Sequence, residues 1–452
     1  MSQVSIGARL NRLPITRTHK FLIAATGLGT FFEMYDILLA ATLAMVLTQK
    51  FHLSAVTLPL VMGSGFLGMF IGCLVLGSLG DRRGRRSLFM ISLAVYSVFT
   101  LIGAFSVNAS MLIITRFIAG IGLGVEFPVV DTYLGDMLPA RYRGVGTAVA
   151  LAIGTCGYST VGFLSRVLVP AHPLGWDGWR WLFVIGSLGA VIVWTIRRQL
   201  PESSRWLESV GRVDEAEAIT RKMEEEALAT LGGRPLPTPS SEEVVIPKKL
   251  PWTYMFHRTY RGRVAVLWIL EIFQTAGFYG FATMVPMVLV AKGFSIVNSL
   301  LYTGLSFLGY PIGGIIATAL AERIQRKWLI VGSTFIIGLF GMLLAFATSA
   351  VPIVIYAFIV VVAGSGLGTG LHIFQAEIFP TAIRSTATSI SYGLSRLAGG
   401  ALPFVLVPLL KSRGPIAMLT AITISMLIVM LDVGIFAPRT TGRALESLNV
   451  VE

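Results

Sequence analysis

Long apolar stretches alternate with short polar segments along the whole chain of 452 residues. An apolar run of roughly 20 residues crosses a bilayer as an α-helix. The pattern predicts twelve such helices, and we therefore expect an all-α membrane protein. The predicted spans are 21–48, 56–80, 88–107, 111–134, 144–169, 181–199, 263–291, 297–320, 328–348, 352–376, 387–410 and 415–436.

The composition supports this class, because 54% of the residues are hydrophobic and only 13% are charged. Soluble domains carry about 25% charged residues. No Gly-Lys dipeptide occurs, which excludes a Walker A loop and an ATP-driven pump. The five histidines have no metal-ligand spacing. We expect no metal, no cofactor and no enzymatic activity.

Most of the 36 Lys and Arg residues lie in every second polar segment, on the side of the N-terminus. One of these segments, GSLGDRRGRR at 77–86, holds four arginines directly after an apolar run. Short basic loops of membrane proteins stay in the cytoplasm. We expect both termini there, and the chain in the plasma membrane, which in a bacterium is the inner membrane. The net charge of +13 is then a topology signal and does not indicate nucleic-acid binding.

Two polar loops of the first half recur in the second half at one shared offset of 241 residues. Asp81 of the first loop matches Glu322, and Asp136 of the second loop matches Glu377. One offset across two separate loops indicates a duplication of six spans. Two parallel six-span repeats are one of the recurring builds of secondary transporters, with the substrate site between them near mid-membrane.

The polar segment between the repeats is a predicted linker. It contains DEAEAITRKMEEEALA, an amphipathic helix pattern, and the Pro-rich RPLPTPSS. The predicted division is 1–20 cytoplasmic N-terminus, 21–199 N-terminal six-helix half, 200–262 cytoplasmic linker, 263–436 C-terminal six-helix half and 437–452 cytoplasmic tail.

Several loop and helix motifs of the chain resemble those of a known family. GSLGDRRGRR resembles the loop 2–3 signature of the major facilitator superfamily, and RFIAGIGLG at 116–124 resembles its fourth-helix signature. PESSRWL at 201–207 and PRTTGRALE at 438–446 resemble elements of its sugar porter and organic-ion branch. The resemblance covers nearly the whole chain and implies twelve helices in two pseudo-symmetric halves that work by alternating access. Two departures, Ser204 and Arg439, replace a proline and an acid of the family pattern.

The resemblance also implies a gate of cytoplasmic charges that pair across the halves when the inside is closed. Topology signalling is the alternative role for the same charges. The predicted gating residues are Asp81, Arg82, Arg85, Arg86, Asp136, Arg143, Glu202, Arg205, Glu322, Arg323, Glu377 and Arg384.

Ionisable residues inside the spans are functional candidates by default. Glu33 and Asp36 lie on one face of the first span. Arg116 lies a few residues inside the outer end of the fourth span, at a depth comparable to that of Asp36. We expect Asp36 to pair with Arg116. Proton-coupled sugar porters, which the chain resembles, carry an aspartate in this setting. Asp36 is therefore the first candidate for proton coupling, with Glu33 as its rival and a structural ion pair as the alternative.

Three further charges lie deep in predicted spans. Glu126 resembles the acid of a pattern in nicotinate-type carriers and is a candidate for coupling or substrate binding. Arg396 lies near mid-membrane, where a guanidinium can hold a carboxylate by two parallel hydrogen bonds. Organic-anion carriers resembled here use arginine in this region. Glu271 faces either the substrate or a neighbouring helix.

The polar pattern favours an acid over a sugar as the substrate. Sugar porters, which the chain resembles, bind hydroxyls with glutamines in spans 5 and 7. Span 5 has none here, and Phe273 stands at a polar position of span 7. Tyr158, Gln274 and Tyr279, together with Arg396, suit a small aromatic carboxylate better than a hexose.

The sequence thus predicts a proton-coupled symporter of a small organic anion, a monomer in the lipid bilayer, with the proton as its coupling ion. A sugar or polyol symporter and a drug-efflux antiporter stay open within the transporter class. A membrane sensor that binds solute is the alternative of another class. It is disfavoured because 200–262 is too short for a signalling domain.

Overall fold

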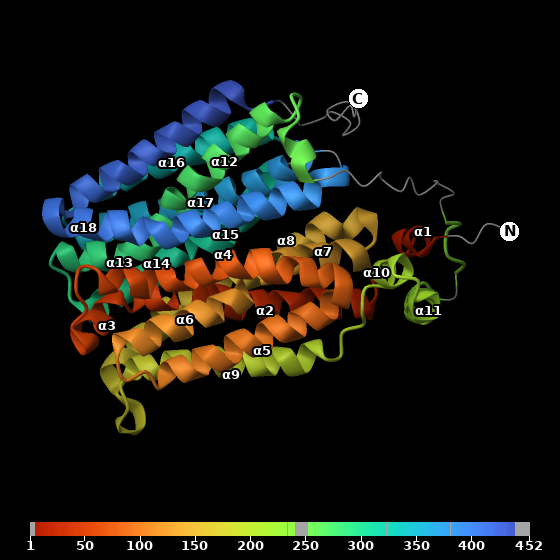
Figure 1. The fold of residues 1–452 in the computed structure, drawn as a ribbon, viewed down its shortest axis with the longest axis horizontal. Coiled ribbons are helices and arrows are strands. Elements are labelled where there is room, and N and C mark those ends of the chain that lie inside the picture. Colours follow the sequence, from red (N-terminus) through yellow and green to blue (C-terminus); the bar gives the residue numbers. More distant parts are fainter. Residues whose placement is uncertain (1–4, 233, 240–251, 322, 380, 439–452) are drawn as a thin grey trace.

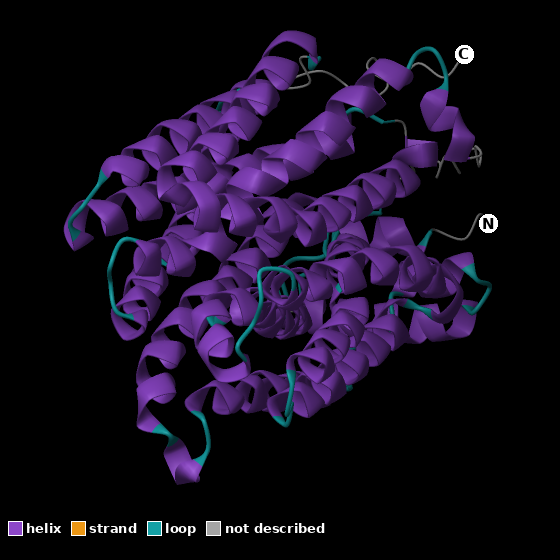
Figure 2. Ribbon diagram, turned by 60° about the vertical axis from the view of Figure 1, so that its left-hand side comes forward, coloured by secondary structure: helices purple, strands orange, loops and turns teal. Residues whose placement is uncertain are grey.

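The structure is a computed structural model that describes residues 5–232, 234–239, 252–321, 323–379 and 381–438. Within these ranges it consists of helices and connecting loops (Figure 2). Eleven helices are long and apolar enough to cross a membrane. The last of them is continuous over 50 residues, 387–436.

This last helix contains two spans. A straight helix of that length would measure about 75 Å, more than twice the thickness of a bilayer core. Gly414 breaks it with φ +79° and ψ −177°, a conformation that favours glycine. Figure 1 shows the chain of α18 (Thr381–Phe436) reversing its direction. The described chain therefore has twelve spans, as the sequence predicts.

The first six spans form what we call the N-terminal set, and two of the six are interrupted helices. Its helices are α2 (Arg17–Thr42) with α3 (Ala44–Phe51), α4 (Thr57–Arg83), α5 (Arg85–Ala104), α6 (Ala109–Leu123) with α7 (Glu126–Met137), α8 (Arg143–Ala171) and α9 (Gly178–Arg197).

The other six spans form the C-terminal set. Its helices are α12 (Arg261–Thr275) with the π-helical η4 (Ala276–Gly280) and α13 (Phe281–Ala291), α14 (Ile296–Phe307) with α15 (Gly309–Ala321), α16 (Arg326–Phe346), α17 (Ala350–Glu377) and α18. The remaining elements are α1 (Ile6–Asn11), η1 (Ala140–Tyr142), η2 (Pro173–Gly175), α10 (Ser204–Ser209), α11 (Val213–Thr230) and η3 (Trp252–Phe256).

Several helices begin at the capping residues that the sequence provides. Thr16 accepts the N–H of His19 and donates its own N–H to His19 Nδ1 at 3.1 Å, which starts α2. Asn108 Oδ1 accepts the N–H of Met111 at 2.8 Å and starts α6. Such side chains satisfy N–H groups that a helix leaves unpaired at its start.

The two sets lie side by side in Figure 1, each as a bundle of long helices. Helices α1, α10 and α11 lie at one end of the molecule, which we call the linker end; α3 lies at the opposite, far end. The sets meet through α4 packed on α18, α8 packed on α14 and α15, and α13 packed on α2 and α3. These helices therefore line the contact between the sets.

Close glycine contacts join the sets toward the far end. A Cβ at Gly63 of α4 would clash with the carbonyl of Gly400 in α18. A Cβ at Gly162 of α8 would clash with the backbone of Gly304 in α14. Small residues let membrane helices approach at backbone distance. The far end is thus the side where the two sets are in tight contact.

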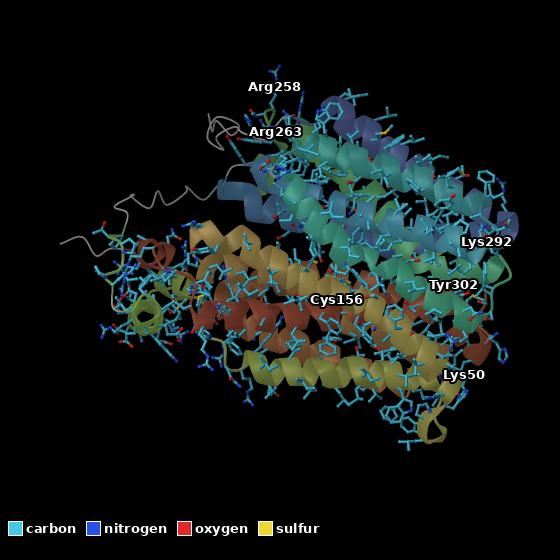
Figure 3. All side chains as sticks on the ribbon, turned by 180° about the vertical axis from the view of Figure 1, so that it is seen from behind. Lys50, Cys156, Arg258, Arg263, Lys292 and Tyr302 are labelled. Carbon is cyan, nitrogen blue, oxygen red and sulfur yellow. The ribbon has the colours of Figure 1, made fainter. Side chains whose placement is uncertain are left out.

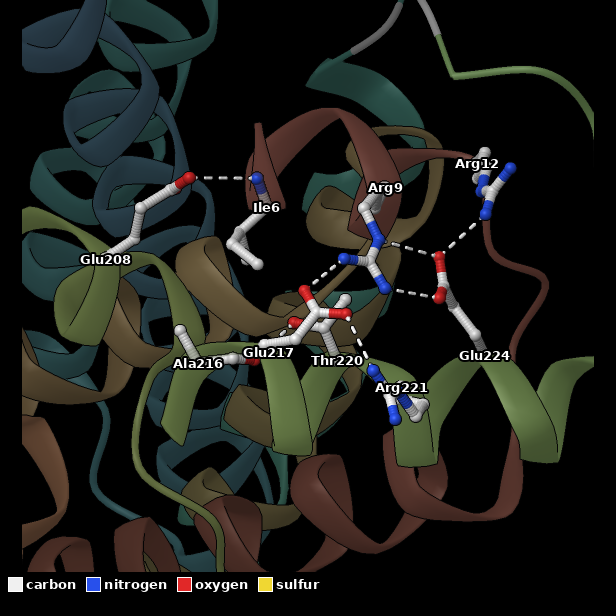
Figure 4. A network of polar contacts seen from close by, with 9 residues as sticks. All are labelled: Ile6, Arg9, Arg12, Glu208, Ala216, Glu217, Thr220, Arg221 and Glu224. Carbon is white, nitrogen blue, oxygen red and sulfur yellow. Dashed lines mark hydrogen bonds and ion pairs between the residues drawn. The ribbon is translucent and has the colours of Figure 1, made fainter. Parts of the chain in front are cut away.

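The N-terminal segment is folded, which the sequence did not predict: α1 packs against the linker helix α11 (Figure 4). Leu10 is fully buried there, and Arg9 donates to both oxygens of Glu224 at 3.1 and 2.6 Å and also pairs with Glu217. Arg12 donates to Glu224 at 2.7 Å. Partial burial raises the pKa of Glu224, but these hydrogen bonds outweigh it and hold that pKa below its ordinary value.

Candidate functional site

The predicted contact between Asp36 and Arg116 is present in the N-terminal set. Arg116 of α6 donates from Nη1 to Asp36 Oδ2 at 2.6 Å and from Nη2 to the Asp36 carbonyl at 2.9 Å. Thr100 of α5 donates to Oδ1 at 3.3 Å. Both ionic side chains are buried. Each oxygen of this carboxylate therefore has a donor.

Glycines place this pair by letting α4 lie against α6. The guanidinium of Arg116 passes Gly65, and a Cβ at Gly120 would clash with the carbonyl of Gly65. The letters GSGFLG at 63–68 also match a dinucleotide-binding pattern, but they lie inside α4. Close helix packing is therefore their role here.

A second buried ion pair joins Glu126 of α7 to Arg197 of α9. Ser92 donates to Glu126 Oε2 at 3.0 Å, and the Arg197 guanidinium lies 4.3 Å from the ring centre of Phe89. A Cβ at Gly29 of α2 would clash with this guanidinium. The arginine thus occupies space that a glycine on the first span leaves open.

Sequence reasoning missed Arg197. It lies near the end of the predicted span 181–199, where an arginine is typical of the cytoplasmic edge of a span. In the structure its side chain is fully buried. The available signal was Glu126, since a carboxylate inside a span needs a cation at its own depth.

Glu33 differs from both of these acids. Its side chain is 1% exposed, and neither carboxylate oxygen has a hydrogen-bond partner. It lies on α2 between the two ion pairs of the N-terminal set. It is thus a buried acid without a local donor.

Arg396 of the C-terminal set resembles Glu33 in being a buried ionisable side chain with unsatisfied polar atoms. It is 3% exposed, and its Nη2 donates to the Tyr392 hydroxyl at 2.5 Å, while Nε and Nη1 have no partner. Its guanidinium lies 4.3 Å from the ring centre of Tyr392 and 4.8 Å from that of Tyr279. No ion pair of Arg396 occurs among the described residues. Two donors of a buried cation are therefore available to an anion.

Aromatic rings surround this position and connect the sets. The ring centres of Phe66 in α4 and Tyr279 in η4 lie 5.1 Å apart, and those of Tyr158 in α8 and Tyr310 in α15 lie 4.5 Å apart. The ring of Phe278 connects these two pairs, with its centre 4.8 Å from that of Tyr279 and 5.4 Å from that of Tyr310. Tyr279 and Phe278 lie in the π-helical segment, and such irregular turns occur frequently at functional sites.

The remaining polar candidates lie on α12. Gln274 donates to Glu271 Oε2 at 3.3 Å, and both side chains are buried. Thr275 donates to the Glu271 carbonyl at 2.7 Å. This acid has a neighbouring donor on its own helix and belongs to the same set as Arg396.

The predicted gating charges in the N-terminal set contact one another at the linker end. Glu202 accepts the N–H groups of Arg85 and Arg86 at 2.9 and 3.1 Å, so a carboxylate caps the start of α5. Asp136 lies 3.7 Å from Arg85 Nε and accepts from Ser203 at 2.8 Å. These contacts hold the linker to the N-terminal set.

Other gating charges also stay within one set. Arg143 and Arg205 both donate to Asn11 Oδ1, at 2.9 and 2.8 Å. In the C-terminal set, Arg326 lies 3.5 Å from Glu377. No described ion pair crosses between the sets at the linker end, so pairing across the halves stays a prediction for another conformation.

Four predicted gating residues cannot be placed from the structure. The side chains of Asp81, Arg82 and Arg384 lie outside the described ones, as does the whole of Glu322. Arg323 is described and exposed.

The glycine of the GDRRGRR loop has a clear structural reason. Gly84 adopts φ +95°, a conformation that L-residues rarely adopt, and a Cβ there would clash with the Glu202 carboxylate. The glycine therefore gives Glu202 access to the start of α5.

Comparisons with known proteins agree with these features. The family model described as "Sugar (and other) transporter" matches residues 21–451. The niacin transporter NiaP of Acinetobacter baylyi is 28% identical over 98% of this chain and 99% of its own length. The gallate transporter of Pseudomonas putida is 28% identical over 86% of this chain and 84% of its own length.

A solved structure shares the fold. The xylose transporter XylE from E. coli, in a partially occluded inward-open conformation, superimposes with a TM-score of 0.77. It is 23% identical, and the match covers 94% of this chain and 99% of that chain.

Proposed function

We propose that this chain carries a small aromatic monocarboxylate together with a proton, on the premise that it belongs to the sugar (and other) transporter family of the major facilitator superfamily. Membership in this family makes it a multi-pass membrane transporter and not an enzyme. The proposed carrier is a monomer in the plasma membrane, which in a bacterium is the inner membrane.

One observation carries the proposed substrate: the buried guanidinium of Arg396 keeps two nitrogens without partners among aromatic rings. An unpaired buried cation costs several kcal/mol, roughly, and a bound carboxylate offsets that cost through two parallel hydrogen bonds. Tyr279 lies against this guanidinium, and Phe66 and Tyr158 belong to the same group of rings, which is an apolar surrounding suited to an aromatic substrate. Niacin, the substrate named for one relative, is an aromatic monocarboxylate.

The proposed orientation places the linker end in the cytoplasm. Figure 3 shows Arg258 and Arg263 at that end, whereas Lys50 and Lys292 lie at the opposite end. Basic segments favour the cytoplasmic side. Since the tight glycine contacts lie toward the far end, we assign this structure to an inward-facing state of an alternating-access cycle.

Uptake into liposomes tests the proposal. Purified protein is reconstituted, and labelled nicotinate and benzoate are offered with and without an inward-directed proton gradient, with glucose as the comparison solute. We expect the two acids to accumulate only when the gradient is present. Accumulation of glucose alone would support the sugar symporter, and binding of the acids without any uptake would support the sensor.

A further inference from the structure

The buried acids of the interior differ in whether they are free to carry the proton that accompanies the substrate. The first candidate from the sequence is Asp36, but both of its oxygens already accept hydrogen bonds, from Arg116 and from Thr100. Glu126 likewise has Arg197 and Ser92. Each of these acids thus already has a buried arginine and a hydroxyl donor as its own partners.

Glu33 has no such partner, although it is as deeply buried. An ionised carboxylate in this position needs a cation close by. The cation of the C-terminal set that acts on it is Arg396, which comes from the opposite side of the contact between the sets. The two do not form an ion pair in this conformation, and each keeps unsatisfied polar atoms.

The other titratable groups that interact electrostatically with Glu33 come from five helices. Glu126 and Asp131 lie on α7, and Arg197 lies on α9. The titratable side chains on the remaining neighbours are Cys73 of α4, Tyr158 of α8 and Tyr392 of α18. Since Glu126 and Arg197 neutralise each other, Arg396 is the cation left to balance Glu33.

We propose that Glu33 is the proton-carrying acid. It is the counter-charge of Arg396 when no substrate is bound, and the substrate carboxylate replaces it in that role. In the empty carrier, ionised Glu33 balances Arg396. A substrate carboxylate that hydrogen-bonds to Arg396 takes over this role and would leave Glu33 as an unbalanced anion. One Glu33 oxygen then takes a proton from solvent, no other bond changes, and the proton returns to solvent after the substrate leaves.

This scheme, which rests on the proposed role of Arg396, makes the loaded and empty carriers equal in interior charge. One proton therefore accompanies each monovalent anion. Glu271 is the competing acid, because it also acts on Arg396. However, it already accepts from Gln274 and moves with Arg396 as part of the same set. Its relation to Arg396 would thus change less when the two sets rock against each other.

Proton uptake on binding tests the proposal directly. Nicotinate is added to the purified protein in weakly buffered detergent solution, and the proton change is followed with an indicator dye between pH 6 and 9. We expect the wild type to take up close to one proton per bound nicotinate at the upper end of this range. Its apparent Kd should rise by up to about tenfold per pH unit there, because binding and protonation are linked.

Three variants distinguish the acids. Glu33→Gln should bind nicotinate without proton uptake, with a Kd independent of pH, and should exchange nicotinate across the liposome membrane without accumulating it. Glu271→Gln should keep proton uptake. Asp432→Asn is the matched control, since Asp432 is a buried acid on α18 with an unpartnered Oδ2 and no proposed role.

The outcomes separate the two proposals. Binding without proton uptake in the wild type, or uptake that survives Glu33→Gln, would overturn the role of Glu33 and leave Arg396 as the clamp. Absence of aromatic-acid binding by the wild type would overturn both. If Glu33→Gln does not fold, the wild-type proton count and Glu271→Gln still decide, because loss of uptake in Glu271→Gln assigns the proton to the other acid.

Discussion

The interiors of the two helix sets handle charge in opposite ways. The N-terminal set contains two complete ion pairs, Asp36 with Arg116 and Glu126 with Arg197. The C-terminal set contains Arg396, whose guanidinium lies against two tyrosine rings and forms no ion pair among the described residues. Paired buried charges hold a bundle together, whereas an unpaired one is available for a ligand. With the role that we propose for Arg396, the two helix sets have different tasks, which the repeat in the sequence does not reveal.

The largest expected effect comes from breaking a pair in the N-terminal set. Arg116→Gln leaves the Asp36 carboxylate buried with only Thr100 as a donor. Removal of one partner of a buried pair costs about 3–5 kcal/mol. We expect a clear fall in the thermal unfolding midpoint in detergent. The double variant with Asp36→Asn should recover part of it, and a single variant as stable as the wild type would remove the distinction between the sets.

The corresponding change in the C-terminal set should act on binding and leave stability intact. Arg396→Gln removes a cation whose Nε and Nη1 have no partner, and Glu33, which then lacks its counter-charge, takes up a proton. We therefore expect the unfolding midpoint of the empty protein to stay the same or rise. Nicotinate binding should weaken by about tenfold to a hundredfold, the loss of a hydrogen bond to a charged group worth about 1.5–3 kcal/mol.

Calorimetric titration and thermal unfolding measure these two quantities on the same sample. Arg396→Lys is the control, because it keeps the charge but not the two parallel donors. It should bind with intermediate affinity. A large loss of stability in Arg396→Gln would mean that this arginine is a structural residue like Arg116.

The contrast explains what the sequence could and could not predict. Spans are visible because each needs a long apolar run, and the depths of Asp36 and Arg116 follow from counting residues along their helices. Arg197 and Asp432 were missed because charges near the end of a run look the same whether they face solvent or the bundle. Burial, and with it the pairing of a charge, depends on helix rotation, which the apolar pattern does not determine.

The same limit applies outside the spans. The linker helix was predictable from its amphipathic pattern, and it is α11. The docking of α1 onto it was not, because the six residues of that helix are too few to show a period. Its contacts are made by the buried Leu10 and by Arg9, which pairs with Glu224. Neither contact can be predicted before the neighbouring helix is known.

A smaller effect should come from the rings around Arg396. Tyr279→Leu removes the ring that lies over the guanidinium and against Phe66. Such ring contacts are worth about 0.5–1.5 kcal/mol, so nicotinate should bind between about twofold and tenfold more weakly. Tyr279→Phe keeps the ring and should bind nearly as the wild type does. Equal losses in both variants would assign the effect to the hydroxyl and count against an aromatic site.

The smallest effect concerns the contact between α1 and α11, where charges pair near the surface. Glu224→Gln weakens the contacts with Arg9 and Arg12, and partly exposed pairs of this kind are worth up to about 1 kcal/mol. We expect amide hydrogens in residues 6–11 to exchange up to about fivefold faster at pH 7, as measured by mass spectrometry. Glu215→Gln is the control, because Glu215 lies on the same helix α11 but pairs with the exposed Arg212 at the start of that helix and not with α1.

The pH dependence of this contact gives the same test without a variant. The pKa of Glu224 lies below its ordinary value in the folded protein, so its stabilisation is complete above that ordinary value and is lost as the pH falls through the folded value. Exchange in residues 6–11, corrected for the intrinsic rate, should therefore rise only in acid, below about pH 4. Because the ion pairs of the spans are deeply buried and those of α1 are not, α1 should detach while the helix sets stay folded. Simultaneous loss of protection in α1 and in α2 would show instead that this contact is part of the bundle's own stability.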